Sequence, residues 1–218
     1  MVASPRRPLP EDRAPESVVR ALPFVRNDAS LVAGLRAGEP WARAALFDRY
    51  APLVERTLRR ILGKDRHTEL ADLVHDAFVQ ALVSIHRLRD ADALPAWMQS
   101  VAAHTAYHAI RARRARRWLR FWEPTTLPDV TVDGVEPHVV EAHRRTYALL
   151  ERLPADERIA FALRHIEGLE LGRLAEICGV SLATIKRRLA KAEQRFARAA
   201  KRDDVLREWL EEGGRWTT

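Results

Sequence analysis

Apolar residues spaced three and four positions apart recur through most of this chain, and this spacing is the strongest constraint on its fold. The clearest example is a stripe of seven residues, Leu73, Val74, Ala77, Phe78, Ala81, Leu82 and Ile85. Such spacing places the apolar side chains on one face of a helix, which must then be buried against other helices. Alternation with a period of two is not sustained over any long stretch. The pattern therefore predicts an all-α protein without strands.

Proline and glycine divide the helical pattern into units. Five prolines interrupt residues 1–28, so we expect this segment to be a disordered Pro/Arg-rich arm. Helical spacing extends over residues 29–118, is broken over residues 119–141 by prolines and a glycine, and resumes over residues 142–202. Residues 203–218 hold five acids against two arginines and form an acidic tail. The sequence thus predicts two small helical domains joined by a flexible linker.

Composition narrows the partners and excludes several kinds of site. Lys and Arg total 37 against 30 Asp and Glu, a net charge of +7, which favours an acidic polymer such as nucleic acid. Cys178 is the only cysteine, so an intrachain disulfide and a cysteine-cluster zinc site are excluded. No run approaches the roughly 18 apolar residues that span a bilayer, and the arm lacks the apolar core of a secretory signal. We expect a cytoplasmic protein with no membrane insertion and no cofactor.

A helix-turn-helix pattern lies in the second domain. A short amphipathic segment ends before Gly179, Ser181 can cap the next helix, and a second apolar stripe follows from Ile185 to Phe196. Between Ser181 and Arg202 there are eight basic residues and one acid, and several of the basic side chains project opposite the stripe. Turn, cap, stripe and charge together predict a helix that enters the DNA major groove. An ordinary solvated basic helix is the alternative.

A second basic segment ends the first domain. Six arginines fall between positions 111 and 120 with no acid among them. Arginines spaced so densely cover several sides of a helix, so they suit phosphates better than base edges. A solvated helix end that leads into a linker would look similar.

Histidines in the first domain raise the possibility of metal chemistry. His104 and His108 are four residues apart, and His75 precedes Asp76, as in metal-dependent phosphohydrolases. The segment from Thr105 to Arg120 contains no acid, and its positive charge would repel a divalent ion. A histidine-metal phosphohydrolase is therefore the less favoured hypothesis.

Three segments, in this order along the chain, resemble the extracytoplasmic-function (ECF) sigma factors of the sigma-70 family. They are Asp72-Leu-Val-His-Asp-Ala-Phe-Val-Gln-Ala-Leu82, the helix from Pro95-Ala-Trp-Met98 to Arg117, and Leu153-Pro-Ala-Asp-Glu-Arg158 with the helix-turn-helix. The resemblance covers residues 29–202 without the linker. It implies that residues 29–118 are region 2, which binds the polymerase clamp and melts the minus-ten element. Residues 142–202 would be region 4, which binds the minus-thirty-five element as duplex.

The resemblance also assigns roles to three sets of residues. Polymerase binding falls on Asp72, His75, Asp76 and Gln80. Minus-ten recognition and melting fall on His86, Arg87, Arg89, Asp90, His104, His108, Arg111, Arg113 and Arg114. Contact with the upstream duplex falls on Arg164, Ser181, Thr184, Lys186, Arg187, Arg188 and Lys191. His75, His104 and His108 differ from the residue types usual in the family, so the minus-ten sequence preference does not transfer. Glu170 replaces the usual Ser or Thr before the helix-turn-helix, where a carboxylate can still cap a helix.

The expected function is therefore that of a sigma factor, not an enzyme. It would bind bacterial core RNA polymerase and promoter DNA, respond to stress or another signal, and be controlled by an anti-sigma factor. Free in solution it would be a monomer whose domains close on one another or are clamped by the inhibitor. It would be cytoplasmic, and nucleoid-associated when active. The main alternative is a helix-turn-helix regulator that acts without polymerase, as a dimer on palindromic DNA.

Overall fold

The computed structural model describes residues 27–63, 67–119 and 137–211. All regular elements in these ranges are helical, in agreement with the predicted fold class. The predicted arm at residues 1–28, except for its last two residues, and most of the predicted linker lie outside the described residues.

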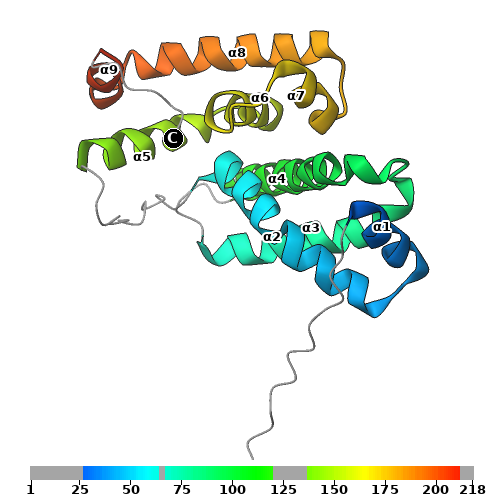
Figure 1. Cartoon of the computed structure of the whole chain (residues 1–218). Coiled ribbons are helices and arrows are strands. Elements are labelled where there is room, and N and C mark those ends of the chain that lie inside the picture. Colours follow the sequence, from blue (N-terminus) through cyan, green and yellow to red (C-terminus); the bar gives the residue numbers. More distant parts are fainter. Residues whose placement is uncertain (1–26, 64–66, 120–136, 212–218) are drawn as a thin grey trace, which may run out of the picture.

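The first domain is a bundle of long helices. Its elements are α1 (Asp28–Ala37), α2 (Pro40–Leu62), α3 (His67–Ser84), the short 3₁₀ turns η1 (Ile85–Arg87) and η2 (Ala91–Ala93), and α4 (Leu94–Leu119). Asn27 caps α1 by accepting a hydrogen bond from the Ser30 backbone N–H at 2.9 Å. Gly38 ends α1 in the left-handed conformation (φ 76°), which permits the turn into α2. Helices α2, α3 and α4 then pack pairwise around the stripe predicted from the sequence (Figure 1).

The second domain contains the helix-turn-helix and extends into the segment predicted as an acidic tail. Its elements are α5 (Pro137–Leu150), α6 (Ala155–Phe161), the π-helical turn η3 (Ala162–Ile166), α7 (Leu171–Cys178), α8 (Leu182–Ala200) and α9 (Asp204–Glu211). Helix α5 begins inside the segment predicted as linker. Helix α9 lies in the predicted acidic tail, yet it packs on α5 and α8 with Leu206 fully buried. The start of the tail is therefore part of the domain core.

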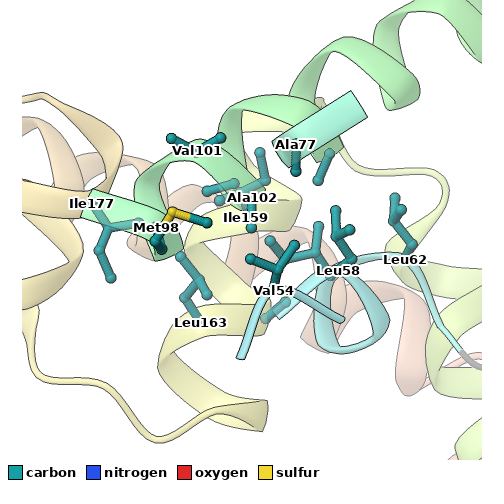
Figure 2. Close-up of a cluster of buried hydrophobic side chains, with 14 of the residues drawn as sticks. Val54, Leu58, Leu62, Ala77, Met98, Val101, Ala102, Ile159, Leu163 and Ile177 are labelled. Carbon is teal, nitrogen blue, oxygen red and sulfur yellow. The ribbon is translucent and has the colours of Figure 1, made fainter. Parts of the chain in front are cut away.

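The two domains share one hydrophobic core. Helix α4 contacts α6 and α7, and α2 contacts η3, so the domains lie directly against each other. Figure 2 shows side chains from both sides of this contact. They are Val54, Leu58 and Leu62 of α2, Ala77 of α3, Met98, Val101 and Ala102 of α4, and Ile159, Leu163 and Ile177 of the second domain. All ten are buried. The chain is thus in a closed arrangement, with apolar surface of each domain covered by the other.

Polar contacts reinforce the closed arrangement at the C-terminal end of α2. The Glu167 carboxylate accepts contacts from Arg56 at 2.9 Å and from Arg60 at 3.4 Å. The Tyr147 hydroxyl donates a hydrogen bond to the backbone carbonyl of Arg60 at 3.1 Å. Because Glu167 and Tyr147 belong to the second domain, these contacts fix its position on the first.

The structure defines the surroundings of Glu170 and Trp97. The cap predicted for Glu170 is wrong, because its side chain makes no capping hydrogen bond to α7. Trp97, which belongs to the Pro95–Met98 segment of the family resemblance, is partly buried and packs against the hydrophobic core at the edge of a groove.

Candidate nucleic-acid interface

The predicted helix-turn-helix is present in α7 and α8. Gly179 ends α7 in the left-handed conformation (φ 62°), which the tight turn requires. Glycine adopts it without steric penalty because it has no Cβ. Ser181 then caps α8, since its Oγ accepts a hydrogen bond from the Thr184 backbone N–H at 3.3 Å. The stripe from Ile185 to Phe196 is buried, so the opposite face of α8 points to solvent. This geometry can present α8 to the major groove of a duplex.

The cations around α8 fall into two groups that the sequence does not distinguish. Arg188 is partly buried and pairs with Asp156 at 3.3 Å, and Arg195 pairs with Glu157 at 3.4 Å. Both acids lie in the first turn of α6. In contrast, the exposed residues Lys186, Arg187, Lys191 and Arg198 have no ion pair within the described part of the chain. The second group is therefore available to an anionic ligand without first breaking an internal contact.

Arg164, also predicted to contact the upstream duplex, has an internal partner. Its guanidinium donates a hydrogen bond to the Leu169 carbonyl at 2.9 Å, in the connection between η3 and α7. Arg164 is only partly exposed. Its local role is to hold the start of the helix-turn-helix against the rest of the domain.

A large groove of about 1190 Å³ runs between the two domains. Helix α3 lines it with Asp72, Asp76, Val79 and Gln80, and α4 lines it with His104, His108 and Arg113. Helix α7 and the turn after it supply Glu176, Ile177 and Gly179. The groove brings part of the predicted polymerase-binding set next to part of the predicted minus-ten set. It also places the helix-turn-helix against the predicted minus-ten surface.

Residues of both domains match known families. Residues 46–116 match Sigma-70 region 2, and residues 143–196 match Sigma-70, region 4. The ECF RNA polymerase sigma factor SigM of Mycobacterium tuberculosis is 30% identical over 178 residues, which cover 79% of this chain and 84% of that protein. The chain belongs to the ECF sigma factors of the sigma-70 family.

Further similarities agree with this assignment. The ECF RNA polymerase sigma-E factor of Haemophilus influenzae is 28% identical over 177 residues, 77% of this chain and 92% of that protein. Among solved structures, CnrH in complex with the cytosolic domain of CnrY shares the fold with a TM-score of 0.55 at 21% identity, covering 81% of this chain and 99% of that one. Sigma factor RpoE in complex with the anti-sigma factor NepR from Bartonella quintana gives 0.54 at 21% identity, covering 73% and 97%. Neither family match includes α1 or α9 of this sigma factor.

The α3 surface of region 2 is more apolar than its polar residues suggested. Asp72, His75, Asp76 and Gln80 are exposed, as a binding surface requires. Val79 and Val83 are also exposed, by 42% and 68%. At helical spacing both valines lie on the same side of α3 as Asp72 and Asp76. These two valines were not predicted as part of the binding surface, because apolar residues of this segment were expected in the buried stripe.

The region 2 loop between α3 and α4 is anchored at its centre and exposed on both sides. Leu88 is buried, and its carbonyl accepts a hydrogen bond from Arg36 of α1. Asp90 accepts a hydrogen bond from the Asp92 backbone N–H at 3.0 Å and so caps η2. The predicted loop residues that remain exposed around Leu88 are His86, Arg87, Arg89 and Asp90. The backbone is thus held while these side chains can contact a ligand.

The basic end of α4 carries both paired and unpaired arginines. The Arg111 guanidinium donates a hydrogen bond to the Tyr107 hydroxyl at 2.8 Å, and Arg113 pairs with Glu69 of α3. The hydrogen bond with Tyr107 raises the pKa of Arg111 above its usual value, so the guanidinium stays charged. Arg114 and Arg116 are exposed and have no ion pair in the described ranges. The side chain of Trp118 and all of Arg120 and Trp122 lie outside the described residues.

The structure gives no support to the alternative of metal chemistry in this sigma factor. Within the described ranges, no three His, Cys, Asp or Glu side chains are placed to hold a metal ion, and this includes His75, Asp76, His104 and His108.

Among the helices that the structure describes, none is both long and apolar enough to cross a membrane.

Proposed function

We propose that this ECF sigma factor binds bacterial core RNA polymerase, directs it to specific promoters and catalyses no reaction itself. One observation supports this most strongly: the chain combines an unpaired cationic face on α8 with a second exposed surface on α3, which carries Asp72, Asp76, Val79 and Val83. A regulator that acts without polymerase needs only the first of these surfaces. The site of action would be the cytoplasm, with nucleoid association when the protein is active.

The α3 surface is the proposed contact with polymerase. Asp72 and Asp76 supply negative charge, Gln80 and His75 supply hydrogen-bonding groups, and Val79 and Val83 supply apolar area. An exposed apolar patch rimmed by polar groups is typical of a protein-binding surface. The partner surface would therefore be basic, with apolar side chains at its centre.

The loop and α4 are the proposed contacts with the minus-ten element. A base that is extruded from the duplex needs a pocket, and the exposed loop residues His86, Arg87, Arg89 and Asp90 surround the anchored Leu88. The histidines His104 and His108 line the groove that leads away from α3. Arg111, Arg113 and Arg114 would follow the phosphates of the opened strand, because guanidinium groups bind phosphate through paired hydrogen bonds.

Helix α8 is the proposed contact with the minus-thirty-five duplex. Lys186, Arg187 and Lys191 face solvent, while Ser181 and Thr184 form the cap that begins the helix. We assign Arg188 and Arg164 a supporting role, because both already bind groups of region 4 itself.

Promoter binding requires the closed arrangement to open. Elements at minus ten and minus thirty-five are separated by roughly 85 Å of duplex at about 3.4 Å per base pair. In the closed arrangement α7 forms a wall of the groove that contains His104 and His108, so the helix-turn-helix occupies space next to the minus-ten surface. Polymerase would supply the binding energy that separates the domains and holds them at the promoter spacing.

A regulatory partner follows from the same family assignment. One structure with the same fold is a sigma factor in complex with an anti-sigma factor. We infer that an anti-sigma factor also controls this protein, and that the free protein is a monomer.

Transcription in vitro tests the proposed function. Core polymerase is mixed with the full chain and a library of promoter fragments, and the transcript starts are sequenced. We expect discrete starts that share two spaced upstream elements, and their loss in the double variant Asp72→Asn, Asp76→Asn. The matched control is Asp204→Asn, which removes an exposed acid of α9 far from α3. Binding of the chain to palindromic duplexes as a dimer, with no starts for any core enzyme, would favour the polymerase-independent regulator.

A further inference from the structure

The exposed residues of α8 can be sorted by their direction around the helix. The buried residues Ile185, Leu189, Ala192 and Phe196 define the side that faces the core of region 4. At about 100° per residue, Arg187 lies within roughly 10° of the point opposite the centre of this buried side. Lys186 and Lys191 lie on either side of that point, about 90° and 50° away from it. Arg187 is therefore central on the solvent face, and the two lysines are at its flanks.

Small residues stand before and after Arg187 on the same face. Ala183 lies one turn earlier and Ala190 about one turn later, and both are exposed. Their short side chains allow the helix backbone to approach the floor of a major groove. Arg187 is then the longest side chain on the central line of the first two turns, about 7.5 Å from the start of α8. This is the part of a recognition helix that contacts base edges.

Residues further along α8 are less suited to base contact. Gln194 lies on the same central line but about 18 Å from the start of the helix, where a recognition helix leaves the groove. Arg188 and Arg195 are held by the α6 acids Asp156 and Glu157. These two cations are therefore already paired within region 4. Arg187 has no such partner among the described residues.

The central cation, Arg187, also differs in its chemistry from the two flanking cations, Lys186 and Lys191. A guanidinium group donates two parallel hydrogen bonds and matches O6 and N7 of guanine. A lysine ammonium is a compact, strongly hydrated charge on a flexible stem, which suits a phosphate at the groove edge. Position and chemistry therefore support the same division of roles.

We propose that Arg187 determines sequence specificity in region 4 by contacting a guanine of the upstream element, while Lys186 and Lys191 bind phosphates on the two walls of the groove. This assignment rests on the proposed function, and it divides a set of cations that sequence resemblance treats alike. It also explains why Ala183 and Ala190 are small, since a larger side chain at either position would hold the helix away from the bases.

Base analogues test the assignment. The probe is a set of duplex promoter fragments recovered from the transcription library, bound by the full chain in complex with core polymerase. Each guanine of the upstream element is replaced singly by 7-deazaguanine, which pairs normally but lacks the N7 acceptor. With the natural chain, we expect one position at which the replacement weakens binding roughly tenfold. With Arg187→Ala, the same replacement should have no effect. Arg187→Lys should keep much of the affinity and show a smaller effect of the replacement, because an ammonium lacks the fixed pair of parallel donors of a guanidinium.

Charge-loss variants at the flanking positions provide the controls. Lys186→Ala and Lys191→Ala should weaken binding to all sequences about equally. Each should also reduce the slope of the logarithm of the binding constant against the logarithm of the salt concentration by roughly one. Arg198→Ala removes an exposed, unpaired cation late in α8 and should leave the 7-deazaguanine effect intact.

The outcomes distinguish the assignment from the proposed function. If transcript starts form but no guanine is sensitive, or the sensitivity is lost in Lys191→Ala and kept in Arg187→Ala, the assignment is overturned and the proposed function stands. If no chain-dependent starts form, the proposed function fails and the assignment fails with it.

Discussion

Arg158 of region 4 binds the backbone of Ile61 at the end of a region 2 helix. Its Nε donates to the Ile61 carbonyl at 2.8 Å, and an Nη donates to the Leu62 carbonyl at 3.0 Å. The last carbonyls of a helix have no donor within the helix, so Arg158 satisfies groups that α2 itself cannot. Arg158 is 3% exposed, which makes this contact part of the interior of the closed protein.

Replacement of Arg158 should destabilise the closed arrangement. Arg158→Ala leaves two buried carbonyl groups without a donor, and each such group costs about 1–3 kcal/mol. We expect a lower free energy of unfolding, measured by urea denaturation, or an additional transition as the domains separate. The control is Arg173→Ala, which removes a partly exposed arginine that pairs with Glu176 on its own helix and should change stability little. Equal effects of the two variants would show that the Arg158 contact is not important for stability.

The cap of α8 gives a second prediction. Ser181 accepts a hydrogen bond from the Thr184 N–H, so Ser181→Ala should cost about 1 kcal/mol of stability. Glu170 holds the corresponding position before α7 but makes no capping bond, so Glu170→Ala should cost much less. Thermal denaturation of the two variants side by side measures the difference. A larger loss for Glu170→Ala would contradict the structure at both helix starts.

Local features of the chain were predictable from its sequence, and contacts between distant segments were not. Helical spacing predicted the buried stripe of α3, and the residues from Gly179 to Ser181 predicted the turn and cap, because these signals lie within a few residues of each other. Met98 and Ile177 are far apart in the sequence, and nothing in either segment shows that both enter one core.

Ion-pair partners could not be predicted either, because they lie on segments that are far apart in the sequence. Arg187 and Arg188 are adjacent and chemically identical, and the family resemblance assigned both of them to the upstream duplex. Only the position of α6 shows that Asp156 binds Arg188 and leaves Arg187 free for another ligand.

The buried leucine of α9 gives a third prediction, at a position that the sequence analysis assigned to an acidic tail. Leu206 is fully buried in the contacts that α9 makes with α5 and α8. Leu206→Ala should therefore cost about 2–5 kcal/mol, as for other leucines removed from a packed core. Arg207→Ala is the control, because Arg207 is exposed and pairs only with its neighbour Asp204 in the described part of the chain. Chemical denaturation gives both values, and a Leu206→Ala effect below 1 kcal/mol would mean that α9 does not support region 4.

Opening of the domains should be visible at Cys178, the only cysteine of the chain. The thiol borders a small cavity of about 260 Å³ between α4 and region 4, next to Ala103 and Ile159. Burial raises the pKa of Cys178 from 9.0 to about 11. Because the thiolate is the reactive form, two pKa units lower the reactive fraction by roughly 100-fold at pH 8. Cys178 in the closed protein should therefore react with iodoacetamide far more slowly than in the unfolded chain.

A charge reversal at the domain contact should raise that rate. The natural Glu167 carboxylate pairs with Arg56 and Arg60. Glu167→Arg places a cation opposite these two arginines, so charge repulsion should push the domains apart. Glu170→Arg makes the same change of charge at a nearby exposed residue that has no such partners, and it should leave the rate unchanged. Mass spectrometry of the labelled protein measures the rate, and small-angle scattering reports the accompanying increase in radius. Faster labelling in both variants would point to local exposure of Cys178, whereas faster labelling in Glu167→Arg alone, with a larger radius, identifies separation of the two domains.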